Sequence, residues 1–267
     1  MKLSAVSLVT VLLAGASASA WETKSQALLQ AVELVNDPHV FGVASLSTKY
    51  ASDHPVSELA GLPITGPEYF APCYPDSGDL LFLGLTVSQT WRNILHSDTK
   101  NGTASIGSNP DPSLPDRRHL DHPGSHHWAH GRPSWRKGMP SKGRATLFGH
   151  FELTNATEQP ELAHKLGKCY LRHHPDASHW APGATDSPHV PFWASFVVDR
   201  VYWVGGFGDE HFIGWFNQSE WRDAWAGRSQ SAQIHRSDAS EQPSLHQLFG
   251  ESTTYSSIDE PLLTFQH

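Results

Sequence analysis

The chain has 267 residues, a formal net charge of −8 at pH 7 and two cysteines. This length allows one or two domains. The acidic balance, without a basic patch of the kind that phosphate backbones demand, excludes nucleic acid as an expected partner. Beyond the N-terminal segment no run is long and apolar enough to span a bilayer, so we expect no membrane association.

Residues 1–20 have the pattern of a secretory signal peptide. Lys2 supplies a positive start, residues 3–14 are mostly apolar but too few to cross a bilayer, and residues 18–20, Ala-Ser-Ala, form a small-x-small cleavage site. We expect cleavage before Trp21. The sequence therefore predicts a protein that is secreted to the extracellular space, or delivered through the secretory pathway to the lumen of a vacuole or lysosome.

Asn-x-Ser/Thr tripeptides at Asn101, Asn155 and Asn217 support export. In an exported eukaryotic chain each would carry a glycan and so mark a surface. The two cysteines, Cys73 and Cys169, allow one disulfide in an oxidising compartment. This bond would close a loop of nearly a hundred residues and stabilise the fold by about 4–5 kcal/mol. Two buried free thiols are the alternative, and the sequence does not decide between them.

The predicted elements start with a helix behind Thr23. Thr23 and Gln26 fit a capping box, and apolar residues recur at three- and four-residue spacing as far as Val35. The elements expected next are a strand over 40–50, short extended pieces between turns over 55–75, a strand over 80–87 and a helical turn capped by Ser88.

Residues 97–142 differ in composition from the sequence on either side. They are rich in Gly, Pro, Ser, Asp, Arg and His and poor in aliphatic residues, so we expect a long inserted loop with one short strand at 103–108. Five histidines crowd part of this insert, namely His119, His122, His126, His127 and His130. Neutral imidazoles bind zinc or copper, but no cysteine joins them and nearby glycines and prolines would hold them loosely. They are weak candidates for a metal site.

Alternating apolar and polar residues return behind the insert. The expected elements are a strand over 144–154, a helix over 158–171, strands over 192–198 and 201–204 joined by a turn at Asp199-Arg200, a strand over 212–216 and a helix from 219 that Gly227 ends. Residues 227–267 are rich in Ser and Gln and predict a flexible tail. About six strands with peripheral helices predict a mainly β protein with peripheral α, built as a small barrel.

An ordered set of residues lies in the segment KCYLRHHPDASHW…HVPFWASFVVDRVYWVGGFG. Its members are His174-Pro175 behind a helix, Trp180, His189, Phe192-Trp193, Trp203-Val204 and Phe207-Gly208. With GLPITGPEYFAP upstream, this set resembles the CREG-like branch of the pyridoxamine 5′-phosphate oxidase-like, FMN-binding split barrels. The resemblance covers roughly residues 25–95 and 144–225.

The resemblance implies a domain over residues 21–226, folded as a six-stranded antiparallel split β-barrel that pairs into a homodimer. In the enzyme branches FMN lies at the dimer interface, with Arg, Lys and Ser side chains on its phosphate. In the CREG-like branch the members are secreted or lysosomal glycoproteins with an occluded flavin pocket, and Asn155 matches a glycan position. The insert at 97–142, the pair Gly205-Gly206 and the longer tail depart from that pattern, so occlusion does not simply carry over.

The chain itself offers few candidates for a flavin site. Arg92 lies near a strand end, where it could meet a phosphate, and Gly205 and Gly206 would allow close approach to a flavin ring. The alternative is a surface cation beside a barrel corner. No cofactor is firmly predicted, although FMN is one that the fold would admit, and no catalytic residue is singled out.

Tryptophans gather near the end of the predicted barrel, at Trp193, Trp203, Trp215, Trp221 and Trp225. Such residues are enriched where surface is buried against a partner, although a core also accommodates them. We expect a dimer seam across residues 192–216.

Three functional hypotheses follow. The first is a secreted CREG-like glycoprotein that acts by binding, with a vestigial or occluded flavin cleft and with a protein partner in addition to its own second copy. The second is an FMN-dependent oxidoreductase of the pyridoxamine 5′-phosphate oxidase-like class. The third is a secreted protein that binds metal through its histidine-rich insert. The sequence leaves open whether the protein is an enzyme.

Overall fold

The computed structural model describes residues 22–107, 128–129, 132–133, 142–185, 187–208 and 211–228. The strands are β1 (Val43–Lys49), β2 (Pro63–Ala71), β3 (Leu80–Leu85), β4 (Asn101–Gly107), β5 (Trp128–Ala129), β6 (Arg132–Pro133), β7 (Arg144–Thr154), β8 (Pro191–Val204) and β9 (Ile213–Asn217). The α-helices are α1 (Lys24–Val35), α2 (Gln89–His96), α4 (Pro160–His173) and a helix over 218–228. Within these described segments no helix is long and apolar enough to cross a membrane.

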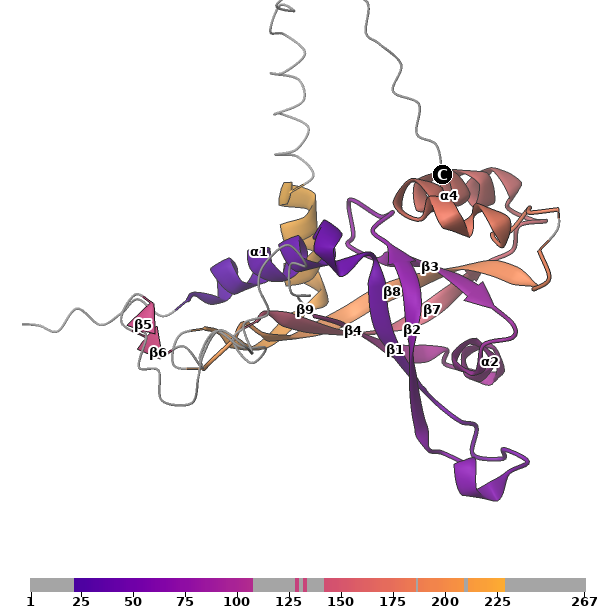
Figure 1. Ribbon diagram of the computed structural model, residues 1–267, viewed down its shortest axis with the longest axis horizontal. Coiled ribbons are helices and arrows are strands. Elements are labelled where there is room, and N and C mark those ends of the chain that lie inside the picture. The colour runs from indigo at the N-terminus through magenta and orange to yellow at the C-terminus, as the bar shows by residue number, and fades with distance from the viewer. Residues whose placement is uncertain are drawn as a thin grey trace, which may run out of the picture. The chain divides into compact units, whose positions relative to one another are not determined.

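Six strands form a closed antiparallel ring in the order β3-β2-β1-β4-β7-β8, because β3 pairs with β2 on one side and with β8 on the other. Strand β9 pairs with the end of β8 and lies outside the ring (Figure 1). Strands β5 and β6 form a separate two-stranded sheet. The expected six-stranded antiparallel split barrel with peripheral helices is therefore confirmed.

Aromatic side chains fill the interior of the barrel. Along β7 every second residue from 145 to 151 is buried, as the period of two in a strand requires. The ring of Phe82 lies 5.6 to 6.1 Å from the rings of Phe70, Trp91, Phe151 and Phe196. The pairs of Phe82 with Trp91, Phe151 and Phe196 are edge-to-face, and each such pair contributes about 0.5–1.5 kcal/mol beyond area burial. Because Trp91 belongs to α2, this helix is part of the same core.

Helix α4 packs on the outside of the barrel. Its residues Leu166 and Tyr170 form a second buried cluster with Leu81 and Leu83 of β3 and Trp193 of β8. These β3 and β8 residues face away from the barrel interior. Both faces of the β3–β8 pair are therefore covered, which explains why their sequences are apolar without alternation.

A disulfide joins Cys73 and Cys169, with an S–S distance of 2.07 Å and a Cα–Cα distance of 5.9 Å. Cys73 lies between β2 and β3, and Cys169 lies in α4. The bond therefore fastens α4 to the barrel beside the second cluster, and it decides a pairing that the sequence leaves open.

Strand β8 is continuous, where the sequence predicts two strands and a turn at Asp199-Arg200. Its register against β7 shifts between Phe148 and Gly149, and Asp199 is the extra residue of a β-bulge. Asp199 and Arg200 are both exposed, so two adjacent residues face outward. Two adjacent polar residues in an apolar segment look like a turn in sequence, and the predicted turn is wrong for this reason.

The bulge coincides with a change of partner along β8. Strand β3 pairs with residues 191–196 and β9 pairs with residues 200–204, so neither strand reaches Val198. The Val198 N–H donates to Asp79 Oδ1 at 2.9 Å, and its carbonyl accepts a hydrogen bond from Gln218 Nε2 at 3.0 Å. Two side chains thus satisfy backbone groups that would otherwise be left unpaired inside the protein.

Strand β4 lies within the segment that the sequence assigns to a loop insert at 97–142. The strand expected at 103–108 is present as β4, and it pairs with β1 on one side and β7 on the other. It is therefore a barrel strand, because it bridges the two halves of the ring. The insert proper begins behind Gly107.

Two local expectations also change. The pieces expected over 55–75 include one nine-residue strand, β2, because residues 63–69 pair with β1 and residues 70–71 pair with β3. Ser88 precedes α2 as expected, but its hydroxyl donates to Glu68 Oε1 at 3.0 Å instead of capping the helix. In α1 the predicted capping box of Thr23 and Gln26 is confirmed.

Several predicted features lie outside the described residues. These are the signal peptide over 1–20, the candidate metal ligands His119, His122, His126, His127 and His130, and the tail beyond residue 228. The barrel and its helices belong to a compact unit that ends at Gly227.

Gly149 should resist substitution because the bulge brings two backbones together. A Cβ at this position would overlap the carbonyl oxygen of Val197, whereas a Cβ on Gly107 at the end of β4 would meet open space. We expect Gly149→Ala to destabilise the protein by about 1–3 kcal/mol and Gly107→Ala to leave stability nearly unchanged. Thermal unfolding of both variants tests this, and equal melting temperatures would contradict it.

Asp79 should stabilise the fold through its hydrogen bond to Val198. Asp79→Ala removes the acceptor of a buried N–H, which costs about 1–3 kcal/mol. Asp79→Asn retains an oxygen acceptor and should lose less than half as much. Urea unfolding of the two variants beside the wild type measures the difference. Equal losses in both variants would show that the hydrogen bond to Val198 is not what Asp79 contributes.

Candidate functional site

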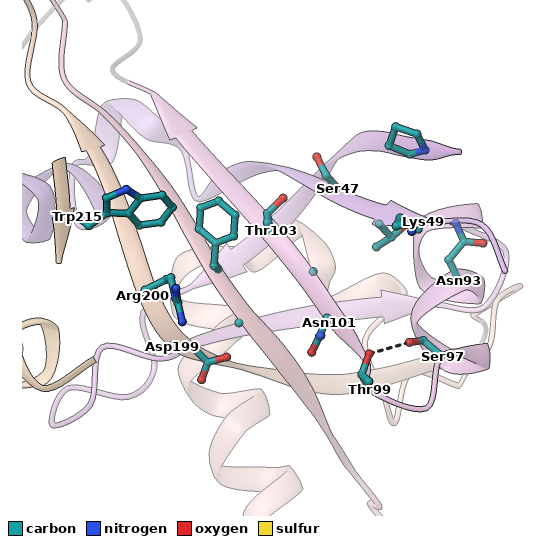
Figure 2. A pocket seen from close by; sticks show the side chains of 15 residues that line it. Ser47, Lys49, Asn93, Ser97, Thr99, Asn101, Thr103, Asp199, Arg200 and Trp215 are labelled. Carbon is teal, nitrogen blue, oxygen red and sulfur yellow. Dashed lines mark hydrogen bonds between the residues drawn. The ribbon is translucent and has the colours of Figure 1, made fainter. Parts of the chain in front are cut away.

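A groove of about 660 Å³ runs over the outer face of the sheet. Its lining comes from β1, β4, β7, β8 and β9, from the first residue of β2, from α2 and from the link behind α2. In Figure 2, Trp215 and Arg200 lie on one side of it, Lys49 and Asn93 on the other, and Thr103 between them. The groove therefore combines residues that are far apart in the sequence.

The register of the sheet explains why these side chains meet. One row of opposed residues consists of Ser105, Thr146, Tyr202 and Trp215. The neighbouring row consists of Ser47, Thr103, Phe148, Arg200 and Asn217. Residues two apart along a strand share a face, so the two rows lie side by side, about 7 Å apart.

Trp215 stands on this outer face with 49% of its surface exposed. Its ring centroid lies 5.2 Å from that of Phe148 and 4.9 Å from that of Tyr202. We call Phe148, Tyr202 and Trp215 the aromatic trio. The other four tryptophans that gather in this part of the sequence, two of them within the expected seam, are each 2% exposed or less and belong to the two cores, namely Trp193, Trp203, Trp221 and Trp225. Of these five tryptophans, Trp215 therefore offers surface to a partner.

The charges of the groove are few and separated. Among the described residues that line it, the cations are Lys49 on β1 and Arg200 on β8. Strands β4 and β7 lie between them, which places them about 14 Å apart along the sheet. Asp199 lies beside Arg200, and its carboxylate is 3.4 Å from His150 Nδ1.

This arrangement does not fit the phosphate of FMN in a single protomer. A flavin phosphate needs several cations and hydroxyls that converge on one point. Here the two cations, Lys49 and Arg200, stand on strands three positions apart in the sheet, and the acidic residue Asp199 directly precedes the arginine. The remaining lining of hydroxyls, amides and aromatic rings suits a neutral ligand better.

Helix α2 closes one end of the groove and is held firmly in place. Asn93 Nδ2 donates to Thr48 Oγ1 at 3.2 Å, and Trp91 Nε1 donates to Glu68 Oε2 at 3.0 Å. Burial raises the pKa of Glu68, and the hydrogen bonds from Trp91 and Ser88 partly oppose that rise. The lining at this end is therefore fixed by contacts to β1 and β2.

The structure does not bring the candidate flavin residues together. Arg92 is exposed on α2, whose Trp91 packs 5.5 Å from Phe192 at the start of β8. Gly205 and Gly206 follow the other end of β8, which is roughly 40 Å away along a strand of this length. None of the three lines the groove.

Local packing and backbone geometry explain why glycine occupies positions 205 and 206. A Cβ on Gly205 would lie 2.9 Å from Glu22 Oε2 and 3.0 Å from Trp203 Nε1. Glu22 Oε2 in turn accepts a hydrogen bond from the Phe212 N–H at 2.8 Å. Gly206 has φ +153°, a value that favours glycine. The two glycines therefore allow the backbone behind β8 to pass close to Glu22 and Trp203.

All three candidate glycosylation sites are exposed, but in different settings. Asn155 Oδ1 accepts hydrogen bonds from the N–H groups of Thr157 and Glu158 in the loop behind β7. Asn217 Oδ1 accepts from the Glu220 N–H at 2.9 Å and so caps the helix over 218–228. Asn101 differs from both, because it lies in the lining of the groove.

A second hollow of about 610 Å³ lies beside His174. The His174 ring is buried, stacks on Tyr69 at 4.7 Å and donates from Nε2 to the carbonyl oxygen of Phe70 at 2.7 Å. A Cβ on Gly42, which has φ +59°, would lie 2.6 Å from this ring. His174 therefore connects the end of α4 to β2, and we assign it a structural role.

Sequence reasoning missed most of the groove. Ser47, Lys49 and Phe148 were not singled out, although alternation along β1 and β7 indicates that such residues face outward. Which outward residues meet depends on the register between strands. That register depends here on a bulge that resembles a turn in the sequence.

Distant structural relatives include a heme-binding protein from Mycobacterium smegmatis, with 16% identity and a TM-score of 0.48 over 74% of this chain and 60% of that protein. This chain thus corresponds to about three fifths of that relative. A protein related to general stress protein 26, of the pyridoxinephosphate oxidase family, from Clostridium acetobutylicum has 11% identity and a TM-score of 0.40 over 74% of this chain and 99% of its own. Likenesses this distant carry no information about ligand or activity.

Comparison with curated protein sequences gives no match. The family model described as CREG, beta-barrel matches residues 22–223, which include all the strands of the closed ring and β9. This chain belongs to the CREG beta-barrel family.

Proposed function

We propose that this protein is a secreted, N-glycosylated binding protein, and that its outer sheet face pairs with a second copy of the chain. The observation that carries the proposal is the aromatic trio, in which Trp215 is half exposed while four neighbouring tryptophans are buried. Exposed aromatic clusters with a polar surround mark interaction surfaces. The signal-peptide pattern over residues 1–20 supports export.

Self-pairing fits the chemistry of this face. Hydroxyl groups of Ser105 and Thr146 lie 3.1 Å apart beside the trio, and Arg200 and Asp199 carry opposite charges at its edge. A two-fold axis brings the same patch from both copies together, so such opposite charges can meet across the interface. The result is an aromatic centre with a polar rim, which is the usual anatomy of a protein interface.

Catalysis with FMN is the second candidate, and the geometry argues against it for one protomer. The groove's two cations are separated and Asp199 lies close to one of them. In the face-to-face pairing proposed here, the groove would serve recognition instead.

Replacing Trp215 should abolish the proposed pairing. In the unglycosylated chain 21–267, we expect a dimer at micromolar concentration, and Trp215→Asp should weaken it by at least about thirtyfold, since a central aromatic anchor contributes about 2 kcal/mol or more. Leu162→Asp is the matched control, because Leu162 is exposed on α4 and lies outside the groove. Sedimentation measures both. A wild-type monomer, or an unaffected Trp215→Asp dimer, would refute the pairing.

FMN should bind weakly or not at all. We expect no saturable quenching of flavin fluorescence by the unglycosylated chain up to about 100 μM FMN. The physical reason is that the described lining of the groove contains two cations on separate strands, and not the converging cluster of cations and hydroxyls that a flavin phosphate needs. Saturable quenching at low micromolar FMN, reduced by Arg200→Ala and unchanged by Arg92→Ala, would instead favour the oxidoreductase hypothesis.

A further inference from the structure

We propose that an N-linked glycan on Asn101 lies in this chain's own groove and covers the aromatic trio. Glycosylation at Asn101 and pairing of the outer face would then exclude one another. This inference rests on the export and the pairing proposed above, and it restricts that pairing to copies of the chain whose Asn101 carries no sugar.

The tripeptide Asn101-Gly102-Thr103 forms the start of β4, within the groove. Residues two apart in a strand share a face, so Asn101 and Thr103 both belong to the outer face. Gly102 points the other way, since a Cβ there would lie 3.0 Å from the ring of Phe151 in the core. A sugar joined to Asn101 Nδ2 therefore starts inside the groove.

The groove leads from Asn101 to the aromatic trio. Asn101 pairs with His150, and Thr103 pairs with Phe148, a member of the trio, in the next row. Trp215 lies two strands and one row beyond Phe148, which places it three strands and two rows, or about 20 Å, from Asn101 along the sheet. An oligosaccharide of several rings spans this distance.

The lining of the groove suits a carbohydrate. Sugars offer hydroxyl groups to polar side chains and their C–H faces to aromatic rings. Thr103 carries its hydroxyl group on the trio's side of Asn101, whereas the hydroxyl groups of Ser47, Ser97 and Thr99 and the amide of Asn93 line the groove on the β1 and α2 side (Figure 2). Trp215 with its two ring neighbours supplies the aromatic surface. A sugar chain here would shield an indole that is otherwise 49% exposed to water.

The other two glycosylation sites differ in their distance from the trio. Asn155 lies in the loop behind β7 and does not line the groove, so it provides a control for glycosylation as such. Asn217 pairs with Arg200 and shares the outer face with Trp215, two residues away on β9. Ser219→Ala, which removes this tripeptide and keeps Asn217 as the helix cap, is therefore the background of every chain in the test, the wild type included.

The test uses the full chain from a eukaryotic secretory host, with matched substitutions at the third position of the tripeptide. Thr103→Val removes the acceptor tripeptide with little change in shape, whereas Thr103→Ser retains it. Asn101→Gln provides a second, independent loss, and Asn155→Gln controls for the loss of a glycan elsewhere. Glycopeptide mass spectrometry reports which asparagines carry sugar.

We expect the wild type, Thr103→Ser and Asn155→Gln to carry a glycan on Asn101 and to sediment as monomers. Thr103→Val and Asn101→Gln should sediment as dimers at the same concentration. At a dilution where every variant is monomeric, hydroxyl radicals should oxidise Trp215 several-fold faster in the two variants without the Asn101 glycan.

Three results would overturn the proposal. They are an Asn101 without sugar in a chain whose Asn155 is glycosylated, a wild-type dimer that carries the Asn101 glycan, and equal oxidation of Trp215 with and without that glycan. If Trp215 oxidation differs as expected but no variant dimerises, the glycan lies on the trio as proposed, while the self-pairing of the proposed function fails.

Discussion

Strand β8 is the element on which the rest of the structure depends. It pairs with β7 along its length, with β3 in its first half and with β9 in its second, so it both closes the ring and carries the strand outside it. The change of partner occurs at the Asp199 bulge, where Asp79 and Gln218 bond the backbone of Val198. Without those two side chains, the switch would leave backbone groups unsatisfied in the protein interior.

The groove is a product of that switch. Because β9 joins β8 behind the bulge, Trp215 is brought beside Tyr202 and Phe148, and the outer face becomes wider than the ring alone would make it. The bulge also turns Asp199 and Arg200 outward together, which sets one charged edge of the groove. Hydroxyls, amides and aromatic rings dominate the rest, so recognition here depends more on shape and stacking than on charge.

The sequence predicts the elements of this fold better than the way in which they meet. Alternation predicted β7 correctly, and the capping box at Thr23 marked the start of α1, because both signals are local. The resemblance carried by residues 168–208 correctly indicated the split barrel. The groove could not be predicted in the same way, since it depends on register across five strands and on a bulge read as a turn at Asp199-Arg200. Arg92 was a candidate for binding a flavin phosphate only because the sequence places it near a strand end. In the structure it is exposed on α2 and does not line the groove.

The disulfide has a consequence for how the ring closes. Leu80 of β3 pairs with Phe196 of β8, well over a hundred residues later, so this contact has the character of a long-range closure that is slow to find. Cys73 lies just before β3 and Cys169 lies in the helix that precedes β8. Once the bond has formed, the path between the two closing strands shortens to roughly a third, which reduces the entropic penalty of closure by about 1 kcal/mol. The disulfide thus shortens the stretch of chain that must close when β3 pairs with β8.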